Sequence, residues 1–177
     1  MKLLCLGDSN TYGFDPRSYL GGRFSHPWPS LLAERLSSEV INLGENGAEI
    51  PHSQGMMTLR IRQIEKHLPA DLLIMMLGTN DVLQTIHEPE KTAAKRMDFW
   101  LSRVQEIFPA LPILLLAPPD VYGHQLGCLY REAAEKHGTP FADCNTWSLP
   151  LAFDGVHLTE EGHQQMSEKI TEIIWRK

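Results

Sequence analysis

The sequence has few of the features that mark membrane, redox, metal-binding or nucleic-acid-binding proteins. Only three of its 177 residues are cysteines and no CxxC pair occurs, which excludes a zinc knuckle or a dithiol redox motif. Lysine and arginine (16) are outnumbered by aspartate and glutamate (22), so a net charge of −6 provides no general surface for nucleic acid. No apolar run approaches the roughly 18 residues of a membrane span.

Other absences narrow the choice further. The odd number of cysteines leaves at least one thiol unpaired within the chain, which favours a reducing compartment. The apolar stretch before Gly7 is too short for a signal peptide, so we expect a cytoplasmic protein. The glycine-rich GxGxxG pattern, the P-loop and the HExxH motif are all missing. A dinucleotide, nucleotide or HExxH zinc site is therefore not expected.

What the chain does have is a regular alternation of apolar runs and amphipathic segments. The short apolar runs predict five buried strands, at 3–6, 40–43, 72–77, 113–117 and 140–142. Apolar residues at helical spacing predict helices between and after them, at 28–36, 57–68, 93–108, 126–134 and 166–174. Strands that are apolar throughout need helices on both faces. We therefore predict one domain over 1–177, a three-layer α/β/α doubly wound sheet of about five parallel strands.

In such a sheet, ligands bind beyond the carboxyl ends of the strands, and polar, sharply turning residues gather there in this sequence. The first predicted strand ends in the residues 7–10 (GDSN), the second in 44–47 (GENG) and the third in 78–81 (GTND). The residues 154–157 (DGVH) follow the fifth. A serine, a histidine, a carboxylate that can orient it and donors for an oxyanion are the groups that acyl transfer needs.

These four blocks resemble those of the SGNH (GDSL-type) esterase and lipase family, in the family's order and over almost the whole chain. The blocks GDSNTYGF and LGTND are especially similar to bacterial arylesterase and acyltransferase members. The resemblance implies a flavodoxin-like SGNH hydrolase fold and a carboxylic ester hydrolase that uses no metal or cofactor. One departure is Asn10, which stands where the family's nickname has leucine.

The resemblance also implies the residue roles. Ser9 would be the nucleophile, His157 the general base and acid, and Asp154 the group that orients it. The oxyanion donors would be the backbone N–H groups of Ser9 and Gly47 and the side chain of Asn80. The spacing from the second strand favours Gly47 over Gly44 without excluding the latter.

The aspartates next to the catalytic positions are expected to have structural roles. Asp8 is expected to fix the nucleophile loop through backbone hydrogen bonds, and Asp81 to cap the helix after the third strand. Five residues close in sequence to the catalytic positions are candidates for an apolar pocket, although the helical spacing of Trp28 also fits the core: Phe14, Trp28, Val82, Phe153 and Val156.

The substrate is expected to be a small-molecule ester with a short-chain acyl, aryl or acetyl group, because the chain has little spare sequence for a lid or a long acyl tunnel. Lysophospholipase or thioesterase activity is the alternative within the family. A different hypothesis is a flavodoxin-like domain that binds phosphate or flavin with residues 8–13, but it leaves 78–81 and 154–157 without a function. Related arylesterases can assemble, so a homo-oligomer stays open.

Overall fold

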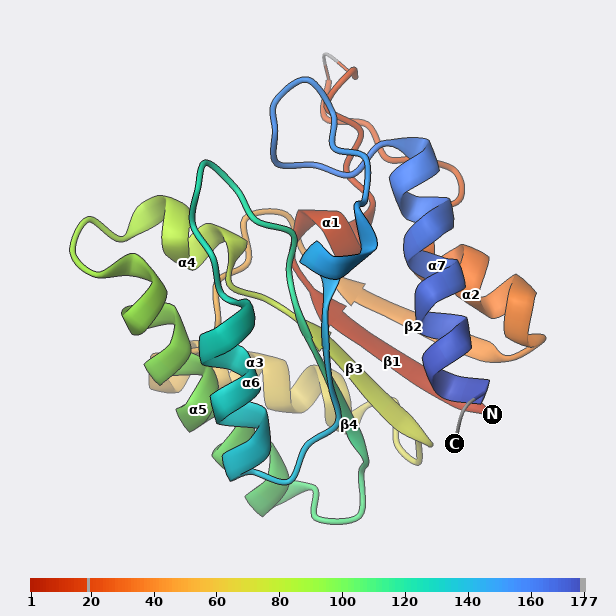
Figure 1. Cartoon of the computed structure of the whole chain (residues 1–177). Helices are drawn as coiled ribbons and strands as arrows, with labels where there is room; N and C mark the ends of the chain where they lie inside the picture. The colour runs from red at the N-terminus through yellow and green to blue at the C-terminus, as the bar shows by residue number, and fades with distance from the viewer. Residues whose placement is uncertain (19, 176–177) are drawn as a thin grey trace.

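A computed structural model describes residues 1–18 and 20–175 and shows a twisted parallel sheet between two layers of helices (Figure 1). The strand order is β2-β1-β3-β4-β5, and every neighbouring pair is parallel. The strands are β1 (Lys2–Gly7), β2 (Glu39–Gly44), β3 (Leu72–Met76), β4 (Ile113–Ala117) and β5 (Phe141–Asp143). The predicted fold class and the five predicted strands are confirmed.

The helices form the two outer layers. α2 (Trp28–Leu36) and α7 (Glu160–Trp175) pack on one face, and α3 (Gln54–Glu65), α5 (Pro89–Ile107) and α6 (Gly127–Lys136) cover the other (Figure 1). Local sequence determines where two of the helices begin. Pro89 occupies the first position of α5, where a missing N–H is tolerated. The Thr159 hydroxyl caps α7, because it accepts the N–H of Gly162 at 3.0 Å.

The core is divided by the sheet, because successive side chains of a strand point to opposite faces. In β1, Leu4 and Leu6 pack with α3 and α5, whereas Leu3 and Cys5 pack with α2 and α7. Strands β3 and β4 alternate in the same way, and most of their side chains are 0–1% exposed. This two-sided burial explains why the strands are apolar throughout instead of alternating with polar residues.

Three short elements fall outside the predicted pattern: α1 (Ser9–Tyr12), α4 (Thr79–Gln84) and the 3₁₀ helix η1 (Cys144–Trp147). Each is too short to show a helical period in the sequence. All three directly follow a strand, and α1 and α4 follow β1 and β3, the adjacent strands at which the sheet changes its winding direction. The crevice of a doubly wound sheet lies at this point.

Two further observations concern the described residues alone. No helix within 1–18 and 20–175 is both long enough and apolar enough to cross a membrane. The thiols of all three cysteines are free, two of them buried and Cys128 exposed. The expectation of at least one unpaired thiol is therefore confirmed.

Candidate active site

Ser9 begins α1 at the carboxyl end of β1. The turn into the helix is held by Asp8, whose Oδ1 accepts the N–H of Asn10 at 2.9 Å, as expected for a residue that fixes this loop. Gly7 is required because a Cβ there would lie 2.8 Å from the Met76 carbonyl oxygen. Ser9 is 7% exposed, so only a small part of its surface reaches solvent.

The Ser9 hydroxyl lies within hydrogen-bond distance of a histidine that is 148 residues away in the sequence. Ser9 Oγ is 3.0 Å from His157 Nε2, and His157 Nδ1 is 2.7 Å from Asp154 Oδ2. Asp154 Oδ1 also accepts the backbone N–H groups of Val156 and His157, both at 3.0 Å. The three-residue spacing thus forms a tight turn from which both side chains point toward Ser9.

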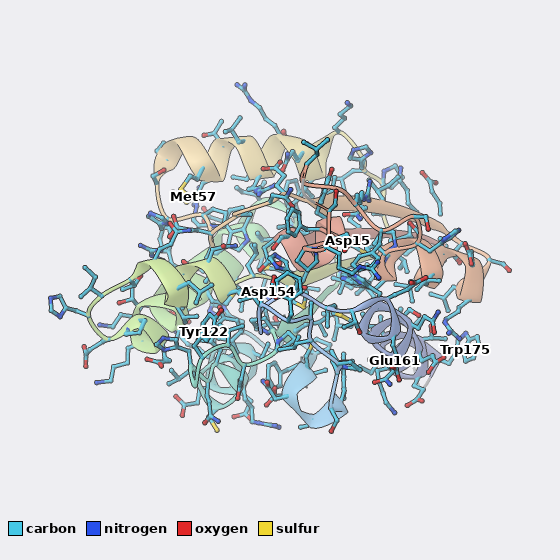
Figure 2. The ribbon with its side chains drawn as sticks, turned by 90° about the horizontal axis from the view of Figure 1, so that it is seen from above. Asp15, Met57, Tyr122, Asp154, Glu161 and Trp175 are labelled. Atoms are coloured by element: carbon cyan, nitrogen blue, oxygen red, sulfur yellow. The ribbon has the colours of Figure 1, made fainter. Side chains whose placement is uncertain are left out.

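The electrostatics keep Asp154 ionised. Burial opposes its ionisation, but the hydrogen bonds from the His157 ring and from two backbone N–H groups together lower its pKa. Tyr122 donates its hydroxyl hydrogen to the Asp154 carbonyl oxygen at 2.6 Å. Figure 2 looks down on the site and shows Asp154 near the centre with Tyr122 beside it. An anionic carboxylate is what a histidine needs to stay in the tautomer that accepts a proton at Nε2.

The Gly47 loop, residues 45–53 between β2 and α3, begins beside β1, where the Glu45 N–H donates to the Gly7 carbonyl oxygen at 3.1 Å. Gly47 has φ +73°, and its N–H donates to no group among the residues that the structure describes. The N–H of Gly44, by contrast, donates to Asn42 Oδ1 at 2.9 Å. Asn80, at the start of α4, donates from Nδ2 to the Ala48 carbonyl oxygen at 2.9 Å, which uses one of its two amide hydrogens.

Asp81 holds the same loop, and the prediction that it caps the helix after the third strand is wrong. Its Oδ2 accepts the N–H of Ile50 at 2.9 Å, while Oδ1 accepts Arg96 Nη1 at 2.7 Å. Arg96 Nη1 also reaches Glu49 Oε1 at 3.1 Å, so the guanidinium joins the two carboxylates. Asp81 is 0% exposed; burial raises its pKa, and the hydrogen bonds from Ile50 and Arg96 act in the opposite direction.

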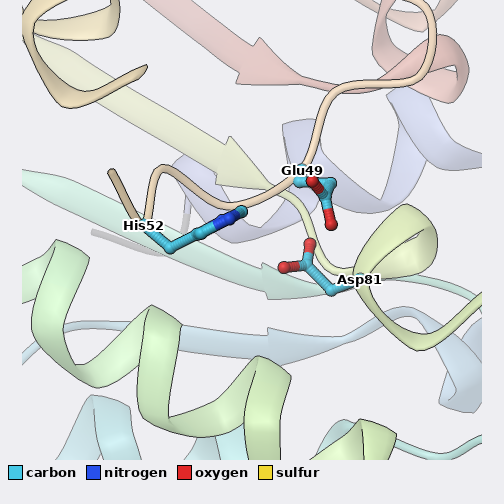
Figure 3. Close-up of side chains that lie close together, drawn as sticks. All are labelled: Glu49, His52 and Asp81. Atoms are coloured by element: carbon cyan, nitrogen blue, oxygen red, sulfur yellow. The ribbon is translucent and has the colours of Figure 1, made fainter. Parts of the chain in front are cut away.

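Glu49 and Asp81 also lie close to His52, and Figure 3 shows the three side chains converging. Such a cluster resembles a metal site in its residue types. Here both Asp81 oxygens already accept hydrogen bonds, Arg96 brings a positive charge between the carboxylates, and His52 Nδ1 lies 3.0 Å from the Ile50 carbonyl oxygen. The donor set therefore fits an ion-pair network that anchors the Gly47 loop, and it does not fit a cation site.

The five candidate pocket residues fall into two groups. The Phe14 ring lies 4.7 Å from the His157 ring, between centroids, Val156 is half-buried in the turn, and Phe153 is 82% exposed. Trp28 and Val82 are 0% and 3% exposed and pack in the cores on opposite faces of the sheet. Their assignment to a pocket is wrong, because closeness in sequence to a catalytic position does not bring a side chain to the surface of the site.

Several contributors to the site were not found from the sequence. Asn10 contacts the backbone on both sides of His157, Arg96 pairs with Asp81, and Tyr122 supports Asp154. Of the three, only Asn10 stood out in the sequence, because a polar amide occurs there in place of the leucine of the family's nickname. Arg96 and Tyr122 carried none, because their partners lie 15 and 32 residues away.

A hydroxyl, an imidazole and a carboxylate in a hydrogen-bonded row can perform acyl transfer. The model of the GDSL-like Lipase/Acylhydrolase family matches residues 5–165, and the chain belongs to this family. GDSL lipase Rv0518 of Mycobacterium tuberculosis is 31% identical to it over 189 residues, which cover 96% of this chain and 79% of the relative.

Solved structures agree with this assignment. A carbohydrate acetylesterase family member from Sinorhizobium meliloti is similar with a TM-score of 0.84 and 25% identity, over 99% of this chain and 97% of that one. The native aryl esterase of M. smegmatis shares the fold with a TM-score of 0.85 and 24% identity, over 99% and 98% of the two chains. The protein is a carboxylic ester hydrolase, which replaces the hypothesis of a flavin-binding domain.

Proposed function

We propose that the protein hydrolyses short-chain acyl, aryl or acetyl esters through a covalent acyl-enzyme on Ser9. The observation that carries this proposal is the row of hydrogen bonds from Ser9 Oγ through the His157 ring to Asp154 Oδ2, at 3.0 and 2.7 Å. A serine hydroxyl is a weak nucleophile until a base within hydrogen-bond distance takes its proton. His157 is that base here.

In the acylation step, His157 Nε2 takes the hydroxyl proton while Ser9 Oγ attacks the carbonyl carbon of the ester. The imidazolium is stabilised by the ionised Asp154 and then gives the proton to the leaving alcohol as the carbon–oxygen bond breaks. In the second step, water gives its proton to His157 and attacks the acyl-enzyme. The acid leaves, and the proton returns to Ser9 Oγ.

The carbonyl oxygen gains negative charge in both steps and needs donors that are already oriented. We assign three: the backbone N–H groups of Ser9 and Gly47 and the second Nδ2 hydrogen of Asn80. The hydrogen bond of Gly44 to Asn42 supports the choice of Gly47, because an N–H that already has a partner must lose it before it can serve an oxyanion. Asn80 is oriented by its bond to Ala48.

A short acyl group fits the surface around His157. Each methylene of a longer chain gains about 0.8 kcal/mol only when it is buried. The half-buried Phe14 ring lies beside the His157 ring, and the half-buried Val156 precedes His157 in the chain, so the apolar surface that these two residues offer suits a small acyl group. The acetylesterase name of one similar structure points the same way.

The test is a series of chromogenic esters from acetate to dodecanoate, assayed with the parent and with Ser9→Ala. We expect kcat/KM to fall beyond the short chains and kcat to fall on the order of 10⁴–10⁶ in the variant. Ser25→Ala is a matched control, because Ser25 Oγ also lies 2.9 Å from a histidine, His26 Nδ1, on the exposed surface. A parent that hydrolyses none of the esters, or a Ser9→Ala variant that keeps its activity, contradicts the proposal.

Labelling separates nucleophilic activation from mere exposure. A fluorophosphonate should modify Ser9 and leave Ser25 unmodified, as peptide mapping by mass spectrometry will show.

Lysophospholipid and acyl-thioester substrates belong in the same ester assay, because a higher kcat/KM on them would favour the alternative activities in the family. Activity in the presence of a chelator tests the prediction that no metal is used. The cytoplasmic location, the single domain and the oligomeric state stay predictions.

A further inference from the structure

The Asn10 side chain joins the residue after the nucleophile to the loop that carries the histidine. Its Nδ2 donates to the Val156 carbonyl oxygen at 3.0 Å, and its Oδ1 accepts the Leu158 N–H at 2.8 Å. These two backbone groups lie directly before and after His157. Asn10 is 2% exposed, and its bond to Leu158 is buried, whereas its bond to Val156 is partly buried.

The other backbone groups of Val156 and His157 are also hydrogen-bonded. Asp154 Oδ1 accepts the N–H groups of Val156 and His157, and the His157 carbonyl oxygen accepts the Ala152 N–H at 2.7 Å. Asp154 belongs to the same turn, so its bonds fix the shape of the turn but not its distance from Ser9. Asn10 is attached to the nucleophile through one peptide bond, and its bonds set that distance.

We propose that Asn10 is a positioning residue, which holds the His157 backbone so that Nε2 stays within hydrogen-bond distance of Ser9 Oγ. This inference rests on the proposed function, in which His157 takes the Ser9 proton. An asparagine suits the task because its amide offers a donor and an acceptor on one rigid group, matching a carbonyl and an N–H two residues apart. A leucine at this position would leave the half-buried Val156 carbonyl and the buried Leu158 N–H without these partners.

The experiment compares Asn10→Leu and Asn10→Asp with the parent. A displacement of about 1 Å can cost about 100-fold in rate, so we expect kcat for a short ester to fall by about that factor, with KM changed by less than about threefold. The rate of fluorophosphonate labelling of Ser9 should fall in parallel. Asn10→Asp keeps the size of the side chain and the acceptor for Leu158, so it tests the bond to Val156 if the leucine variant does not fold.

Asn145 provides a matched control. Its amide also bridges two segments, because Oδ1 accepts the Asp120 N–H and Nδ2 donates to the Pro118 carbonyl oxygen at 3.3 Å. Asn145→Leu should lower the melting temperature as Asn10→Leu does, while kcat measured well below that temperature stays unchanged. A third readout is the downfield proton NMR signal of His157 Nδ1–H, which should broaden only in the Asn10 variants.

Two results would overturn the inference: a kcat within about threefold of the parent in folded Asn10 variants, or an equal loss of kcat in Asn145→Leu. Failure of the proposed function looks different. In that case Ser9→Ala retains activity and Ser9 is not labelled, whatever the Asn10 variants do. Normal Ser9 dependence together with unaffected Asn10 variants refutes the positioning role alone.

Discussion

Two loops at the carboxyl ends of the strands, the turn of residues 154–158 and the Gly47 loop, are held in different ways. In the turn of residues 154–158 the backbone N–H and carbonyl groups around His157 all have partners. The Gly47 loop is anchored at Ala48 and Ile50, but the Gly47 N–H itself has no partner within the described part of the chain. The backbone next to His157 is thus fully hydrogen-bonded, whereas the Gly47 loop keeps a donor unused.

Two asparagines show the same contrast. Asn10 uses both the donor and the acceptor of its amide on backbone groups, whereas Asn80 uses one hydrogen and keeps the other. A group that fixes a distance needs all of its bonds in the resting protein. A group that stabilises a charge formed only during the reaction must keep a donor for it. In the proposed mechanism, the number of bonds that an amide makes at rest therefore distinguishes the positioning residue Asn10 from the oxyanion donor Asn80.

Among the substitutions that test this comparison, a substitution of Asn80 is expected to have the largest effect on kcat. Asn80→Leu removes the free amide hydrogen, and we expect kcat to fall by about 10²–10³, as for the loss of one oxyanion donor. KM should change far less, because the lost bond forms mainly in the transition state. The same ester assay measures both constants.

Asn46→Leu serves as its control, since Asn46 is an exposed asparagine on the Gly47 loop, to which Asn80 is hydrogen-bonded. An equal loss of kcat in this variant would mean that the loop is merely disturbed by leucine. A kcat of Asn80→Leu near that of the parent would remove the side chain from the list of donors.

The second largest effect concerns the buried side chains of Asp8 and His163, whose pKa values shift in opposite directions. Burial raises the pKa of Asp8 from 3.8 to about 6, and burial lowers the pKa of His163 from 6.5 to about 4. His163 therefore binds fewer protons in the folded state, and its contribution to stability is lost as the pH falls from 6.5 to 4. Asp8 binds more protons in the folded state, so its contribution falls as the pH rises from 3.8 to 6.

Unfolding by urea at pH 7 and pH 4 separates the two. Relative to the parent, His163→Asn should gain about 3 kcal/mol between pH 7 and pH 4, and Asp8→Asn should lose a similar amount. Asparagine keeps an acceptor near the Trp28 N–H in the first variant and near the Asn10 N–H in the second. Equal pH profiles for the parent and both variants would show that neither group titrates differently on folding.

The smallest effect is expected at Gly47. A Cβ would meet no atom within 4 Å, so Gly47→Ala costs only the strain of a positive φ, about 1 kcal/mol. If its N–H serves the oxyanion, the altered backbone should also lower kcat by about tenfold, less than the removal of a donor. Gly138→Ala matches it in strain and open space, with φ +59°, and should lower stability without changing kcat. Identical kinetics in the two variants would argue against Gly47 as a donor.

Much of this could be read from the sequence, for identifiable reasons. The strands are buried on both faces and therefore stand out as apolar runs, and α5 and α7 are long enough to show a helical period. The site blocks were visible because glycine and polar residues interrupt those runs at the strand ends. The short helices α1 and α4 were not predicted, because a helix of four to six residues shows no helical period. Asp81 was misassigned because its hydrogen-bond partner Ile50 lies far from it in the sequence.

The sequence by itself therefore determined the fold class, the family and the identity of the residues at each strand end. Local patterns suffice for these, since burial and turn formation depend on residues near in the chain. Only the tertiary structure decided that Ser9 Oγ lies 3.0 Å from a histidine 148 residues away, that Trp28 belongs to the core, and that Asp81 anchors the Gly47 loop. Those contacts depend on how the strands are ordered and how the loops cross the sheet edge, and no local pattern specifies either.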